Sequence, residues 1–155
     1  MGHLVDAILA DKEKQLKLVW QAREWTIFCA KTIEAQAPDF WKDLLAAVQE
    51  LVKKLRLPAT ACQELFPSRF IVHEPHYPTI DVLVELDVAA RTIRYTTILK
   101  PSRDVLASHS ERRLPFHLDE AGELYLKRGD AILNVADAAE LLLQPFLKGS
   151  HKSIS

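Results

Sequence analysis

The chain has 155 residues, of which 48% are hydrophobic and 26% are charged, and its formal net charge is −1 at pH 7. These values are typical of a globular protein with a full core, so we expect a single domain over residues 1–155. The nearly balanced charge gives no broad field, so neither nucleic acid nor a membrane is an expected partner. The four glycines are too few for a phosphate-binding glycine loop, which excludes the Walker and dinucleotide-binding classes.

Compartment and cofactors follow from what the sequence lacks. No apolar run approaches the roughly 18 residues that cross a bilayer, and the first residues lack the basic and apolar regions of a signal peptide. The two cysteines, Cys29 and Cys62, form no CxxC pair, and we expect both to be reduced. These features predict a cytoplasmic protein without a cofactor.

The N-terminal third of the chain has a helical pattern. Apolar residues recur at helical spacing over residues 4–37, and a broader apolar stripe follows over residues 40–57. Pro38 and Asp39 separate the two segments, and Asp39 is a good helix cap. We therefore expect a helical hairpin over residues 4–57. If residues 4–37 formed a continuous helix, they would span about 50 Å, which exceeds the width of a compact domain of this size.

The middle of the chain has the alternation of strands. Apolar residues occupy every second position from Ile80 to Val88, and three of the four positions between them are acidic. A short turn then leads into a second strand that contains Arg94. Further strands are expected at residues 69–74, 114–118 and 123–127, and Pro115 favours an edge position for one of them. Together they predict a five-stranded antiparallel sheet over residues 69–127, made of two hairpins plus one strand.

The last expected element is a helix over residues 134–147, capped by Asn134, that packs on one sheet face. The predicted fold class is therefore α+β. The expected element order loosely resembles that of small secretion chaperones, with a polar and partly helical insert between strands. That resemblance implies a protein-binding module, and no sequence motif carries it further.

The polar face of the predicted sheet is one candidate site. Alternation places Asp81, Glu85 and Asp87 on one side, with Arg94 across the hairpin and His73 on the preceding strand. A carboxylate beside a histidine is the raw material of acid–base chemistry. Acid–arginine pairs on a wet sheet face are also ordinary cross-strand partners, which is the favoured interpretation. We therefore assign no catalytic residue.

Three histidines are weak candidates for metal binding. His73 and His76 flank Glu74, and His117 approaches in the expected second hairpin. Three imidazole or carboxylate ligands would suit zinc. Pro75 excludes the helical HExxH geometry, so we expect no metal site.

The segment from Lys100 to Arg113 has no clear period and is expected to form a long polar loop or a short helix. Loops of this length are often functional. Its positive charge is suited to phosphate or carboxylate, because charge-assisted hydrogen bonds bind anions. The candidate ligand-binding residues, with the neighbouring strand included, are Arg94, Lys100, Arg103, His109, Arg112 and Arg113.

Two functional hypotheses follow. The favoured one is a non-enzymatic binding or regulatory module that self-associates as a dimer through the long first helix, with Leu16 and Trp25 at the interface. The alternative is a small-molecule or anion-binding domain, with or without enzymatic activity, in which the segment 100–113 covers the exposed sheet face. A protein partner of the kind implied by the chaperone resemblance is a third possibility.

Overall fold

A computed structural model describes residues 2–66 and 68–147 of the chain. The chain divides into two compact units, one up to Thr32 and the other from Ile33 onward, and each is described by itself. The fold is α+β, as expected, with a long helix, an antiparallel sheet and a short second helix. The elements in chain order are α1 (Gly2–Lys54), η1 (Ala59–Ala61), β1 (Cys62–Phe66), β2 (Arg69–Glu74), β3 (Thr79–Asp87), β4 (Thr92–Lys100), β5 (Ser108–Leu118), β6 (Leu124–Arg128), β7 (Ala131–Leu133) and α2 (Val135–Leu142).

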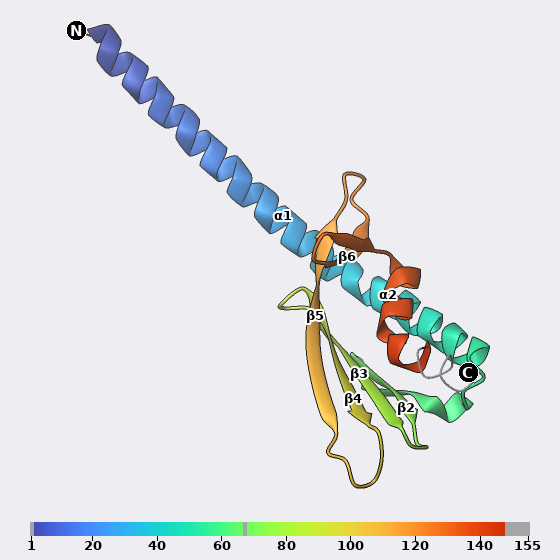
Figure 1. The fold of residues 1–155 in the computed structure, drawn as a ribbon. Coiled ribbons are helices and arrows are strands. Elements are labelled where there is room, and N and C mark those ends of the chain that lie inside the picture. The colour runs from blue at the N-terminus through green and yellow to red at the C-terminus, as the bar shows by residue number, and fades with distance from the viewer. Residues whose placement is uncertain (1, 67, 148–155) are drawn as a thin grey trace. The chain divides into compact units, whose positions relative to one another are not determined.

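The sheet is a meander in which every strand pairs with the next one along the chain. Its order is β1-β2-β3-β4-β5-β6-β7, and all six pairings are antiparallel. Figure 1 shows β2 to β5 side by side, with α2 on the same side of the sheet as residues 33–54 of α1. The alternation seen in the sequence is the buried and half-buried alternation of β3. We call the face away from the helices the outer sheet face.

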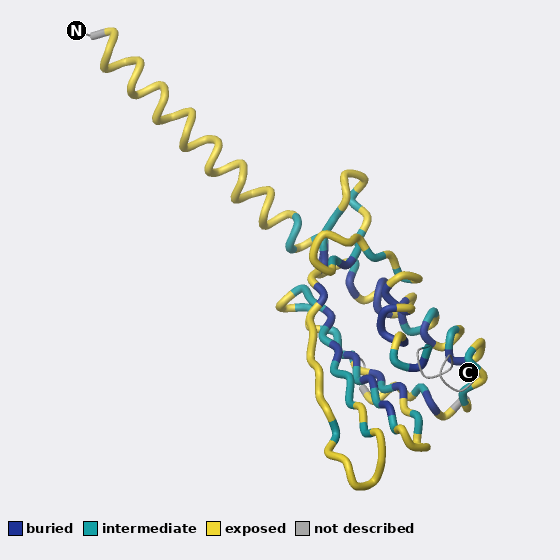
Figure 2. Tube along the Cα trace, in the orientation of Figure 1, coloured by how far each residue is buried: buried dark blue, intermediate teal, exposed yellow. Residues whose placement is uncertain are grey.

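The core lies between the sheet and the helices of the second unit. Residues 33–54 of α1 include one stripe of buried residues, and Figure 2 shows buried positions on this helix and on the strands of the sheet. The stripe packs on the sheet through aromatic contacts. Trp41 lies 5.1 Å from Phe70, and Phe40 lies 5.3 Å from Phe116, measured between ring centroids. The buried stripe contains Ile33, Ala37, Phe40, Trp41, Leu44, Val48 and Val52.

The short helix α2 completes the hydrophobic core. Asn134 caps it, because its side chain accepts a hydrogen bond from the Asp137 backbone at 2.8 Å and Asp137 reaches back to Asn134. The expected cap is therefore confirmed. The helix ends at Leu142, before Pro145, which cannot donate a backbone hydrogen bond.

The predicted helical hairpin is wrong, because α1 runs through Pro38 without a break in helical structure. A proline inside a helix removes one hydrogen bond and costs about 3 kcal/mol. The buried stripe continues at helical spacing on both sides of Pro38, with Ala37 and Phe40 both buried against the core. Packing of this stripe offsets the cost of the proline. Pro38 and Asp39 led to the prediction of a break, although the helical spacing of the apolar residues continues through them.

The prediction of five strands is also wrong, since the sheet has seven in the described residues. Residues 62–66 pair with β2, although their sequence has no clear alternation and no strand was predicted there. Residues 131–133 pair with β6 in a strand too short to show a period. Pro115 is not on an edge strand: it pairs with Thr92 at the end of the β4 ladder, just before β5 begins to pair with β6 at Phe116.

The first unit is a helical segment that is exposed to solvent along most of its length. Residues 3–28 are all exposed, and we call residues 3–32 the N-terminal segment of α1. Trp25 stacks on Phe28 with ring centroids 5.8 Å apart, and Arg23 lies 5.9 Å from the ring of Trp20. None of the helices among residues 2–66 and 68–147 is long and apolar enough to cross a bilayer.

Candidate functional site

The outer sheet face has a row of charged residues in register across four strands. Arg69 of β2 pairs with Glu85 of β3, Glu85 pairs with Arg94 of β4, and Arg94 pairs with Arg113 of β5. The strand period places all four side chains on one face, so the prediction that Glu85 and Arg94 are neighbours is confirmed. The row contains three cations and one anion.

Glu85 is the centre of this row. Its carboxylate accepts a hydrogen bond from Arg94 and lies 3.4 Å from the Nε of Arg69, while its side chain is only 15% exposed. The Nε of Arg94 also lies 3.7 Å from Glu111. The hydrogen bond and the charge of Glu85 raise the pKa of Arg94 above its usual value, because both favour the guanidinium. Arg94 is therefore engaged by two carboxylates and is a poor candidate for binding an external anion.

A cavity of about 420 Å³ lies along this row, and all four residues of the row line it. Asp87 and Glu85 line it together with Arg69, Arg94 and Arg113. The cavity contains its own counterions, and its charged pairs are those of an ordinary cross-strand ladder. This arrangement agrees with the favoured interpretation of the acidic alternation as a solvated sheet face.

His73 lies where the sequence places it, beside Asp81. The two residues are opposite each other on β2 and β3, and their side chains are joined by a hydrogen bond from or to the imidazole Nδ1. His117 lies on β5, where its ring stacks on Tyr125 with centroids 5.8 Å apart. Two strands separate β2 from β5 at about 4.8 Å per step, so His73 and His117 are too far apart to share one ion. No group of metal-ligating side chains is formed in the described part of the chain.

The loop predicted from Lys100 to Arg113 is wrong at both ends. Strand β4 continues to Lys100 and β5 begins at Ser108, so only residues 101–107 connect them. The first six residues of β5, Ser108 to Arg113, are polar and exposed, so the sequence lacked the apolar alternation that indicates a strand. The same connection lacks the helical insert on which the chaperone resemblance depended. Arg103 lies in the connection and is exposed.

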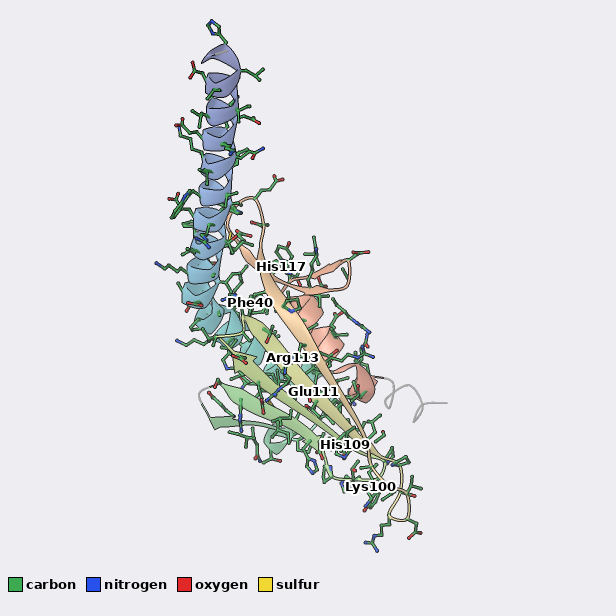
Figure 3. The ribbon with its side chains drawn as sticks, turned by 90° about the vertical axis from the view of Figure 1, so that its left-hand side faces the viewer. Phe40, Lys100, His109, Glu111, Arg113 and His117 are labelled. Atoms are coloured by element: carbon green, nitrogen blue, oxygen red, sulfur yellow. The ribbon has the colours of Figure 1, made fainter. Side chains whose placement is uncertain are left out.

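The strand structure also separates the two adjacent arginines. Arg113, Glu111 and His109 follow one another along β5 on the outer sheet face, as Figure 3 shows. Arg112 lies between Glu111 and Arg113 in the sequence and therefore belongs to the other face of the sheet. It pairs with Tyr95 of β4. A lid that presents both arginines to one side of the sheet is therefore excluded.

A second cavity of about 520 Å³ collects cationic side chains from both sides of β5. We call it the basic cavity. It forms where β5 changes partner from β4 to β6, between Pro115 and Phe116. Sequence reasoning identified its two arginines but missed Lys127 and Arg128, which only the β5–β6 hairpin brings near. The residues that line it are Tyr95, Glu111, Arg112, Arg113, Leu114, Pro115, His117, Lys127, Arg128 and Gly129.

The two residues predicted for an interface are both on the open surface of the N-terminal segment. Leu16 is 59% exposed and Trp25 is 66% exposed. They are nine residues apart, which turns an α-helix by about 180° beyond full turns, so they lie on opposite faces. A single partner helix can cover only one of them. Leu16 belongs to a line with Leu9, Trp20 and Ile27, which the sequence places in the same helical pattern but which were not predicted as interface residues.

Comparison with known proteins adds no relative. No protein-family model, curated protein or solved structure matches this chain. The proposals below therefore rest on the residues and geometry of this chain.

Proposed function

We propose that this protein is a non-enzymatic binding or regulatory module that self-associates through the N-terminal segment of α1. The observation that carries the proposal is the density of large apolar side chains on a helical surface with no cover. Each of them exposes about half of its surface or more. They are Leu4, Val5, Ile8, Leu9, Leu16, Leu18, Val19, Trp20, Trp25, Ile27 and Phe28.

Exposure on this scale is unusual for a monomer. Single exposed apolar residues are normal, but contiguous apolar surface marks an interaction site. Most helix stability in proteins comes from packing of an apolar face, and residues 3–28 have none of it within their own unit. Covering one leucine-sized side chain contributes about 1.5–3 kcal/mol, so four such side chains on each chain supply enough for a dimer. A second copy of this chain is the partner we propose.

The test is a charged substitution on the line that contains Leu16. We expect Leu16→Glu to give a folded monomer in sedimentation equilibrium, because a carboxylate would be buried in the interface. The matched control is Leu18→Glu, which changes an equally exposed leucine on the opposite face and should leave a dimer. A wild-type chain that is monomeric at about 100 μM, or a Leu16→Glu chain that dimerises like wild type, would overturn the proposal.

A second candidate function is anion binding in the basic cavity. Four cationic residues line it, namely Arg112, Arg113, Lys127 and Arg128. None of the four forms an ion pair with another described residue, and the cavity's carboxylate, Glu111, is already close to Arg94. Like charges repel when they are gathered around one cavity, and a phosphate or carboxylate would relieve that repulsion through charge-assisted hydrogen bonds.

Thermal stability in the presence of inorganic phosphate, pyrophosphate and citrate tests this candidate. A bound ligand raises the melting temperature in proportion to its affinity and concentration. We expect Arg112→Ala combined with Arg128→Ala to abolish the rise, while Arg103→Ala, in the exposed connection, leaves it intact. A chain that none of these anions stabilises at low ionic strength does not bind them, and the second candidate then fails.

A further inference from the structure

Along one side of the N-terminal segment of α1, four apolar and two charged residues follow one another at a regular spacing. Leu9, Leu16, Trp20 and Ile27 are separated by seven, four and seven residues, which keeps them on one side of an α-helix. Glu13 and Arg23 fill the two gaps, so that the complete seam advances by four, three, four, three and four residues. This is the spacing of the two core positions of a coiled-coil heptad. We call these six residues the seam.

The seam is its own complement when it is read backwards. From its first residue to its last, it runs apolar, acidic, apolar, apolar, basic, apolar. Read from the other end, apolar positions fall on apolar positions and the acidic position falls on the basic one. We propose that two copies of this chain pair as an antiparallel two-helix coiled coil with a two-fold axis level with Leu18. This inference rests on the self-association proposed above and specifies its orientation.

In the antiparallel arrangement every layer of the seam is complementary. Core layers of an antiparallel coiled coil join the two kinds of heptad position, so that facing residue numbers add up to 36. Leu9 then faces Ile27 of the second copy and Leu16 faces Trp20. Glu13 faces Arg23, and this pairing occurs twice because the interface is isologous. The charges that interrupt the apolar seam thereby become two ion pairs.

The parallel arrangement would bring like charges together. In register, Glu13 would face Glu13 and Arg23 would face Arg23 in the partly desolvated core of the interface. Like-charge juxtaposition in an interface costs several kcal/mol and is a common device against wrong pairings. The residues beside the seam also disfavour the parallel arrangement, since parallel pairing places Lys12 of each copy against Lys17 of the other. Antiparallel pairing places Val19 against Val19, and Lys17 against Lys17 once.

Charge exchange within the seam tests the orientation. In an antiparallel dimer, Glu13→Arg creates two Arg–Arg layers, so we expect its dissociation constant to rise at least tenfold. Glu13→Arg combined with Arg23→Glu exchanges the partners and should return the constant to within about threefold of wild type. In a parallel dimer, Glu13→Arg only replaces one like-charge layer with another, so an unchanged constant would overturn the orientation.

Disulfide mapping gives a second, independent readout. Ala10 and Glu24 lie on the same flank of the seam, and antiparallel pairing brings position 10 of one copy next to position 24 of the other. We expect an Ala10→Cys/Glu24→Cys chain to form 10–24 links between copies on mild oxidation, identified by peptide mass. A chain that dimerises without forming 10–24 links would contradict the antiparallel arrangement while leaving self-association intact. A monomeric wild-type chain would instead remove the proposed function and this inference together.

Discussion

The two parts of α1 share one secondary structure and differ in what surrounds them. Residues 33–54 place a stripe of side chains in the core, where Ala37, Leu44 and Val48 are completely buried. Residues 3–28 carry as many large apolar side chains, and all of these residues are exposed. The comparison teaches that apolar content does not by itself determine burial. The buried part is packed by its own chain, and the exposed part is where we propose that a second copy binds.

The seams of the two parts also differ in a way that suits these roles. The buried stripe is apolar throughout, from Ile33 to Val52. The seam of the N-terminal segment is interrupted by Glu13 and Arg23. A stripe tied to its partner by the chain itself needs no device to select orientation, whereas two separate helices do. Polar residues in a coiled-coil core provide that selection at some cost in stability.

The largest expected difference is between two tryptophan substitutions, one in each part of α1. Trp41→Ala should lower the free energy of unfolding by about 3–5 kcal/mol, because it opens a cavity between α1 and Phe70. Trp25→Ala removes a similar side chain from an exposed face outside the seam and should change stability by at most about 0.5 kcal/mol. Urea unfolding followed by circular dichroism measures both. Similar losses for the two variants would show that Trp25 is buried in a core.

Pro38 lies five residues after the boundary between the two units, and its removal tests how α1 is supported there. Pro38→Ala restores one backbone hydrogen bond that the proline cannot donate. Part of the gain is offset by the greater freedom of the unfolded chain. We expect a net stabilisation of about 1–2 kcal/mol in urea unfolding. Loss of stability would mean that Pro38 marks a required distortion and that the helix is not regular at this point.

The charged row on the outer sheet face should contribute modestly. Glu85→Gln leaves Arg69, Arg94 and Arg113 in one row without their central carboxylate. We expect a loss of about 1 kcal/mol, since Arg94 is 39% exposed and solvent screens the pair. Glu120→Gln, in the exposed turn after β5, serves as the control. An effect above about 3 kcal/mol would mean that the row is more deeply desolvated than its exposure indicates.

The smallest expected effect concerns the thiol of Cys62 in β1. Burial raises its pKa, and the negative charge of Glu64 raises it further. The folded state therefore holds the thiol proton more tightly than the unfolded chain, so this group's contribution to stability is present below the ordinary thiol pKa and is lost as pH rises. Iodoacetamide should alkylate Cys62 several-fold more slowly in the folded protein than in urea at pH 8. Equal rates would contradict the raised pKa.

The comparison also explains which parts of the fold were predictable. The alternation of Thr79–Asp87 and the cap at Asn134 are local signals, and both predicted their elements. Strands β1 and β7 and the exposed first part of β5 have no such signal, because their ladders depend on neighbours and not on an apolar face. Pro38 is a local signal that predicted a break in the helix, but α1 continues through it because tertiary packing maintains the helix.

The candidate sites divide in the same way. The proximity of His73 to Asp81 and of Glu85 to Arg94 followed from the strand period and the short turns. The basic cavity did not, because Lys127 and Arg128 reach it only through the change of partner along β5. Leu16 and Trp25 were assigned to one interface, although both lie in the predicted helical segment 4–37 and a separation of nine residues places them on opposite faces of a helix.

Self-association is tested most directly by the mass of the 155-residue wild-type chain under native conditions, measured by native mass spectrometry and checked by sedimentation equilibrium. We predict a species with the mass of two chains and no additional mass at micromolar concentration. A monomer that persists at about 100 μM would contradict self-association through the N-terminal segment. If that monomer also carried a bound anion, the basic cavity would become the leading functional site.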